Sequence, residues 1–96
     1  MATFISLINF TDQGIRNAKD SPARLKAFRA LVESQGGRVK SAHWTLGHYD
    51  RVVIVEGSEE AAMTSSLTVC SLGNVRTQTL RGFSADEMRN LISKMP

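Results

Sequence analysis

The residues best suited to chemistry gather around one predicted hairpin, which joins a strand over 38–46 to a strand over 51–56. Histidine can act as a general base near neutral pH, so His43 and His48 draw attention first. A carboxylate such as Asp50 can fix the tautomer of a neighbouring histidine, and a phenol such as Tyr49 can donate a proton to a substrate oxygen. We therefore predict His43, Tyr49 and Asp50 as candidate catalytic residues.

The same hairpin also has a purely structural interpretation. Gly47 supplies a backbone with positive φ, Asp50 can hydrogen-bond its own backbone, and Tyr49 can cover the sheet edge. His48 stands at the tip of the turn, where we expect it to be exposed. The sequence leaves both interpretations of Tyr49 and Asp50 open.

A ligand pocket is the second kind of site that the sequence suggests. Side chains alternate between the two faces of a strand. One face should carry Val39, Ser41, His43 and Thr45, and the other Ala42, Trp44 and Leu46. Polar groups inserted in an apolar cavity are typical of ligand sites, and an inward arginine can hold an anion bidentately. The predicted ligand-binding residues are Ser41, His43, Thr45 and Arg76.

Each of these side chains has a competing interpretation. His43 can be a hydrogen-bonded residue of a subunit interface. Arg76 can form an ion pair with Glu56 or Asp50. Trp44 is expected to pack against the helices, and it is not expected to stack on a ligand.

Other chemistries find little support. His43 and His48 are five residues apart across a strand end, a spacing that fits no compact metal-ligand motif, so no metal is expected. Cys70 lies on an apolar helix stripe, which favours an inert packing thiol over a nucleophile. Gly36-Gly37 ends a helix, whereas a phosphate-binding loop opens one. No cofactor is expected.

Composition limits the class of protein further. The chain has 96 residues, enough for one domain over 1–96, and 42% of them are hydrophobic. Its 12 Lys or Arg against 9 Asp or Glu give a net charge of +3, and the cations are scattered, so nucleic-acid binding is not expected. No apolar run approaches the roughly 20 residues of a membrane span. The N-terminus lacks a signal-peptide pattern, so we expect a cytoplasmic protein without membrane association.

Hydrophobic periodicity and capping residues place the elements that must position these side chains. Strands are predicted over 3–10, 38–46, 51–56 and 75–83. A short helical turn should follow Thr11. A helix should begin at Ser21-Pro22 and end at Gly36-Gly37, with Ser21 as its cap. Ser58 should cap a helix that ends near Gly73, and Ser84 with Glu87 fits the capping box of a terminal helix.

The resulting order is β-α-β-β-α-β with a C-terminal helix, which predicts a ferredoxin-like α+β fold with a four-stranded antiparallel sheet. Apolar residues lie on both faces of the predicted strands. In the first strand, Ile5 and Leu7 point to one face, and Phe4 and Ile8 point to the other. The helices cover one face of such a sheet. If the second apolar face were exposed to solvent, it would form a large hydrophobic surface prone to association. We expect a second copy to cover it, giving a homodimeric α+β barrel. The alternative is that the C-terminal helix folds over this face.

Two blocks of the sequence form a recognisable pattern: Trp44–Asp50 followed by Val52–Glu56, and a second block over Leu72–Arg81. In both blocks the chain resembles the GYD domain family. Thr11, Gly14 and Ser21-Pro22 also fit, while His48 separates Gly47 from Tyr49 within the motif. The family is largely bacterial, is similar to dimeric α+β barrel proteins, and mostly has no assigned function. The resemblance therefore implies the fold and self-association, and little about mechanism.

Three functional hypotheses remain open. The first is a homodimeric small-molecule-binding or regulatory module with a pocket at the sheet face. The second is a cofactor-free enzyme, monooxygenase- or isomerase-like, that acts on a small metabolite through His43, Tyr49 and Asp50. The third is a purely structural oligomer. Under all three hypotheses the expected partner of the protein is a second copy of the chain. The first two hypotheses add a small molecule.

Overall fold

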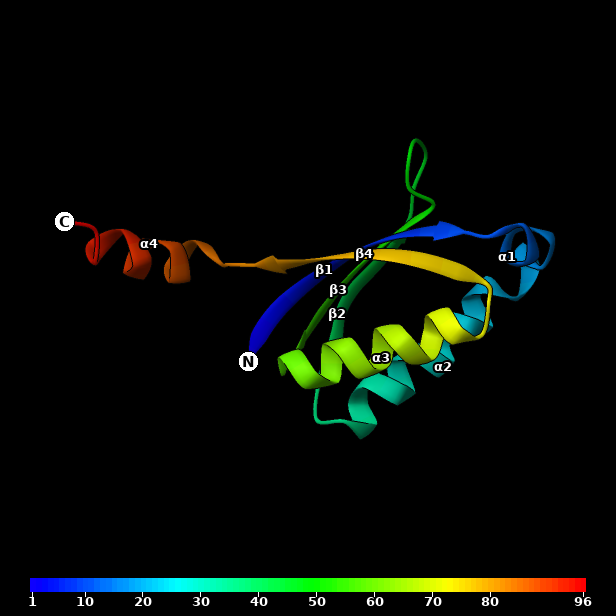
Figure 1. Cartoon of the computed structure of the whole chain (residues 1–96), viewed down its shortest axis with the longest axis horizontal. Helices are drawn as coiled ribbons and strands as arrows, with labels where there is room; N and C mark the ends of the chain where they lie inside the picture. The colour runs from blue at the N-terminus through cyan, green and yellow to red at the C-terminus, as the bar shows by residue number, and fades with distance from the viewer.

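The computed structural model describes all 96 residues and has the predicted order of elements (Figure 1). These are β1 (Ala2–Phe10), α1 (Asp12–Arg16), the 3-10 turn η1 (Ala18–Asp20), α2 (Ser21–Ser34), β2 (Arg38–Trp44), β3 (Arg51–Gly57), α3 (Glu59–Ser71), β4 (Val75–Gly82) and α4 (Ala85–Ser93). The strands form one antiparallel sheet in the order β2-β3-β1-β4. The predicted ferredoxin-like α+β fold is therefore confirmed.

The chain forms two layers, with α2 and α3 packed side by side on one face of the sheet (Figure 1). The core lies between these layers and consists of Ile8, Val32, Val39, Val53, Val55 and Val75. Only 14 of the 96 residues are buried, because one face of the sheet is covered and the other is not. A single copy of the chain therefore has a thin core. No helix has the length and apolar character needed to cross a lipid bilayer.

Side-chain caps explain where most of the helices begin. The Thr11, Ser58 and Ser84 hydroxyls each accept a hydrogen bond from the backbone N–H three residues later, as expected of N-terminal caps. Ser84 and Glu87 form the complete capping box. The prediction that Ser21 caps α2 is wrong, because Ser21 is its first helical residue. Its buried hydroxyl instead accepts a hydrogen bond of 2.8 Å from Trp44 Nε1, which ties β2 to the start of α2.

A β-bulge between Val39 and Ser41 corrects the predicted faces of β2. The extra residue shifts the alternation, so Val39 joins the helix-facing side with Ala42 and Trp44. Ser41 and His43 point to the open face, because they pair with Ile54 and Val52. The prediction that Val39 shares a face with Ser41 and His43 is therefore wrong. Trp44 lies on the helix side, as predicted, and its indole N–H contacts the start of α2, but 46% of the residue stays exposed.

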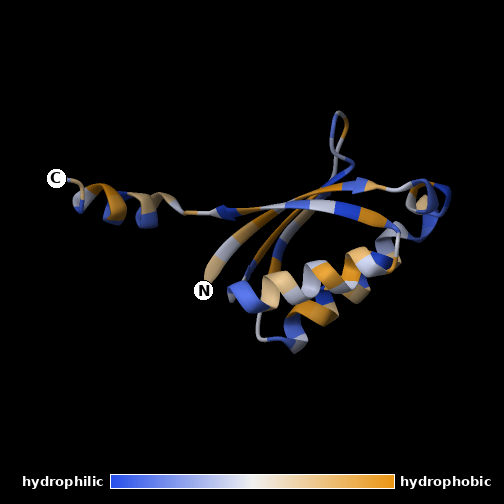
Figure 2. Ribbon diagram, viewed as in Figure 1, coloured by the Kyte–Doolittle hydropathy of each residue, from blue (hydrophilic) through white to orange (hydrophobic).

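The C-terminal helix projects away from both layers, as a continuation of the direction of β4 (Figure 1). It gives the chain an elongated shape of 51 × 31 × 18 Å. The alternative in which this helix covers the open sheet face is wrong for the single chain. Figure 2 shows apolar residues along the strands and also on α4. The apolar stripe of α4 is exposed, and consists of Met88, Leu91, Ile92 and, beyond the last turn, Met95.

Candidate functional site

Asp50 holds the β2–β3 connection against the end of β1. Its Oδ2 accepts a hydrogen bond of 2.8 Å from the backbone N–H of Phe10, and its own N–H donates to the Ile8 carbonyl at 2.9 Å. Its carbonyl accepts from the Thr45 N–H, which closes the base of the loop. These contacts fix the loop to the sheet, and we call the Asp50–Phe10 and Asp50–Ile8 hydrogen bonds the clasp. Asp50 makes no hydrogen bond to His43 or His48.

Tyr49 reaches from the hairpin across the open face of the sheet. Its hydroxyl donates a hydrogen bond of 2.9 Å to Oε1 of Gln78, and Gln78 pairs with Leu7 in the sheet register. Thr45 Oγ1 donates to the Tyr49 carbonyl at 2.5 Å. Gly47, at the turn, has a φ of +106°, as expected. The side chain of Tyr49 thus spans from the β2–β3 end of the sheet to β4 at the other edge.

The predicted ligand-binding residues divide between the two edges of the sheet. Ser41 and His43 lie on the edge strand β2, Thr45 follows its last residue, and Arg76 lies on the opposite edge strand β4. Three interstrand spacings of about 4.8 Å, roughly 14 Å, separate the two edge strands. His43 is exposed and makes no side-chain hydrogen bond. Within one chain, these residues do not converge on one site.

The charges at the edges of the sheet also pair differently from expectation. Glu56 accepts a hydrogen bond from Arg38 at 2.7 Å, and Lys40 Nζ lies 3.7 Å away. The hydrogen bond from Arg38 holds the pKa of the Glu56 carboxyl below its usual value. The predicted pairing of Arg76 with Glu56 or Asp50 is therefore wrong, and Arg76 forms no ion pair.

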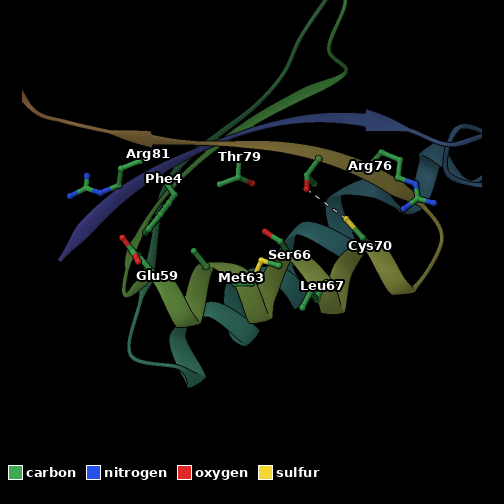
Figure 3. Close-up of a pocket in the computed structure, with 11 residues that line it drawn as sticks. Phe4, Glu59, Met63, Ser66, Leu67, Cys70, Arg76, Thr79 and Arg81 are labelled. Carbon is green, nitrogen blue, oxygen red and sulfur yellow. Dashed lines mark hydrogen bonds between the residues drawn. The ribbon is translucent and has the colours of Figure 1, made fainter.

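The largest cavity is a groove of about 540 Å³ between α3 and the edge strand β4, on the side of the sheet that carries the helices (Figure 3). Its walls are Met63, Leu67 and Cys70 from α3, and Thr79 and Arg81 from β4. Arg76 stands at one end, beside Cys70. The Cys70 thiol is half-buried and lies 3.6 Å from Thr77 Oγ1. Arg76 thus lies at this groove, far from His43.

A second cavity, of about 300 Å³, lies between α2, α3 and the sheet. Most of its lining is apolar: Ala27, Phe28, Leu31, Val69, Leu72 and Val75. Arg51 also lines it and is only 3% exposed. Sequence reasoning missed Arg51, although a signal was present: Arg51, Val53 and Val55 share one strand parity, and both valines lie on the buried face.

Comparison with known proteins adds three findings. The family model described as the GYD domain matches residues 4–92. A relative from Thermus thermophilus is 33% identical over 90 residues, which cover 92% of this chain and 95% of the relative. That relative is named a glutamine synthetase and cystathionine beta-lyase binding protein. A crystal structure of a Thermus thermophilus protein superposes with a TM-score of 0.52 and 25% identity, covering 88% of this chain and 96% of that one.

Proposed function

This chain belongs to the GYD domain family, and we propose that it is a homodimeric binding module with a regulatory role. The observation that carries this proposal is the uncovered apolar face of the sheet. Ile5 lies between Ile54 and Leu80 in the register, and Leu7 is opposite Val52, so these side chains form one continuous patch. A contiguous apolar surface of this kind marks an interaction site.

A second copy of the chain suits this patch better than a dissimilar partner. Its centre is apolar, and its edges carry Arg38, Glu56 and Arg76, which is the usual arrangement of an interface core and rim. A two-fold axis lets the same patch cover itself. If that axis runs parallel to the strands, β2 of one subunit lies over β4 of the other. In that arrangement the start of β4 with Arg76 in one subunit lies over the end of β2, near His43 and Thr45, in the other, at a sheet spacing of about 10 Å, closer than the two edges of one chain.

The regulatory part of the proposal draws on the relative from Thermus thermophilus. That protein is named for binding two metabolic enzymes, and it aligns with this chain over nearly its whole length. A domain of 96 residues without an assembled catalytic group suits such a role. We therefore propose that this chain, as a dimer, associates with a larger metabolic enzyme of its own host. Glutamine synthetase is the first partner to test.

The experiment combines light scattering with sedimentation. The wild-type chain should be a dimer at micromolar concentration, and Ile5→Lys should be a folded monomer because it charges the centre of the patch. Met63→Lys is the matched control, since Met63 is an exposed apolar residue on α3, outside the patch. Co-sedimentation with purified host glutamine synthetase should occur with wild type and Met63→Lys. A monomeric wild type would refute the dimer, and absence of co-sedimentation would refute this partner.

A further inference from the structure

We propose that the 300 Å³ cavity between α2, α3 and the sheet binds a small organic carboxylate with an apolar body, and that Arg51 receives its carboxylate group. This site lies on the helix-covered side of the sheet, opposite the apolar patch, and does not depend on the proposed dimer. Nothing in the family resemblance assigns a ligand to it.

The state of Arg51 carries the proposal. Its side chain is 3% exposed, and its Nε and Nη1 atoms are buried without a hydrogen-bond partner. Leaving a charged donor unpaired in a low-dielectric interior is energetically unfavourable, because the group loses its hydration without gaining a partner. Burial lowers the pKa of the Arg51 guanidinium, and the positive charge of Arg24 lowers it further. An arginine stays protonated through shifts of this kind, so the site has a charge that lacks its counterion.

The chain itself offers Arg51 little compensation. The ring of Trp44 lies 6.0 Å from the guanidinium carbon, at the limit of a cation–π contact. None of the ion pairs in the chain involves Arg51. Asp50, the adjacent residue, has its carboxylate engaged with the Phe10 N–H. The missing anion must therefore come from outside the chain.

The other residues that line the cavity indicate the chemistry of the rest of the ligand. The residues that line it include no Asp or Glu, and Arg24 adds a second positive charge. Arg24 is itself held in place, because its Nη1 donates to the Asn17 carbonyl at 2.9 Å. The walls are otherwise mainly apolar, and the volume is at the lower end of known ligand pockets. The cavity thus suits a small molecule with one charged end, because a planar guanidinium matches a carboxylate bidentately.

The only tryptophan of the chain provides the measurement, because Trp44 lies beside Arg51. Trp44 fluorescence and calorimetry should show saturable binding of hexanoate and phenylacetate, and much weaker binding of hexanol and hexylamine. Arg51→Met should weaken carboxylate binding by at least about tenfold, since it removes a charge-assisted hydrogen bond. The affinity of Arg51→Lys for hexanoate should lie between those of wild type and Arg51→Met. Arg16→Met, at an exposed arginine of α1, should bind as wild type does.

A stability measurement separates loss of the site from loss of the fold. Hexanoate should raise the melting temperature of wild type and of Arg16→Met, but not of Arg51→Met. Without ligand, Arg51→Met should melt at or above the wild-type temperature, because it removes an uncompensated buried charge. Ala27→Leu, which narrows the cavity and keeps Arg51, should also lose binding.

Two results would overturn the proposal. One is that no carboxylate binds more tightly than hexanol, which would mean that water alone satisfies Arg51. The other is that Arg51→Met and wild type bind hexanoate equally. Neither result bears on the dimer, since Arg51 lies on the helix side of the sheet.

Discussion

The carboxylate of Asp50 accepts a hydrogen bond of 2.8 Å from the backbone N–H of Phe10, 40 residues earlier in the chain. This contact joins the β2–β3 connection to the last residue of β1. β1 lies in the middle of the sheet, so the contact fixes the loop that carries Tyr49 relative to the strand on which the sheet is built. Asp50 therefore positions the hairpin, and its carboxylate is already occupied.

Asp50→Ala should destabilise the chain by about 2 kcal/mol, because it leaves the Phe10 N–H without its charged acceptor. Asp50→Asn retains an acceptor oxygen of the same shape and should cost less than half as much. Urea unfolding followed by Trp44 fluorescence measures both values. Equal stability of Asp50→Ala and wild type would show that the clasp contributes nothing.

Gly14 is required by close packing of α1 against the start of β4. A Cβ atom on Gly14 would lie 1.9 Å from the Asn74 carbonyl oxygen, which is a backbone atom. The same carbonyl accepts from the Thr11 N–H at 3.0 Å, so it is held in place. Gly14→Ala should therefore cost more than about 2 kcal/mol through overpacking.

Gly36 offers the matched control for that substitution. It has a φ of +82°, and a Cβ atom added there would have no atom within 4 Å, so Gly36→Ala meets backbone strain and no clash. We expect a loss of about 1 kcal/mol. A smaller loss for Gly14→Ala than for Gly36→Ala, measured by urea unfolding, would contradict the packing explanation.

The helical order of α4 should depend on pH through Glu87. The hydrogen bonds from Ser84 hold the pKa of the Glu87 carboxyl below its ordinary value of 4.5. A carboxylate whose pKa is lower in the folded state stabilises that state above pH 4.5. This stabilisation disappears as the pH falls through the lowered pKa. NMR chemical shifts of residues 85–93 should therefore move toward coil values below pH 4.5.

Glu87→Gln tests the assignment of that transition. The amide can still accept the hydrogen bond from Ser84 but does not titrate, so the transition of α4 below pH 4.5 should be lost. Residues of α3 serve as the internal control within each spectrum. An unchanged transition in Glu87→Gln would place the titrating group elsewhere.

The sequence is sufficient to predict the elements of this fold because the local signals agree. The alternation of Phe4 and Ile8 along β1, the caps at Ser58 and Ser84, and the helix-ending glycines all act over a few residues. The bulge in β2 escaped prediction because Lys40, the extra residue, has no pattern that marks it. That one insertion changes which face Val39 occupies, and it separates Val39 from Ser41 and His43.

The candidate site was harder to predict, for two physical reasons. Strand parity assigns His43 and Arg76 to faces but does not give the order of strands, so it cannot show that β2 and β4 are opposite edges. The buried arginine was visible in phase with Val53 and Val55, but a charge at a strand end is ordinarily solvated. Its significance depends on the absence of a carboxylate nearby, which only the three-dimensional arrangement reveals.

The C-terminal helix α4 has a capping box at its start, but no other element of the chain packs against its apolar stripe. An isolated helix of nine residues is marginal in water, and its stripe of Met88, Leu91 and Ile92 is exposed. Packing against a second subunit would bury this stripe. Backbone amides of α4 should therefore exchange with solvent more slowly in the dimeric wild type than in the monomeric variant Ile5→Lys, whereas those of α3 should exchange alike in both. Leu91→Gln should remove this extra protection and Asn90→Gln should keep it. Equal protection of α4 in wild type and Ile5→Lys would show that no second subunit contacts the helix.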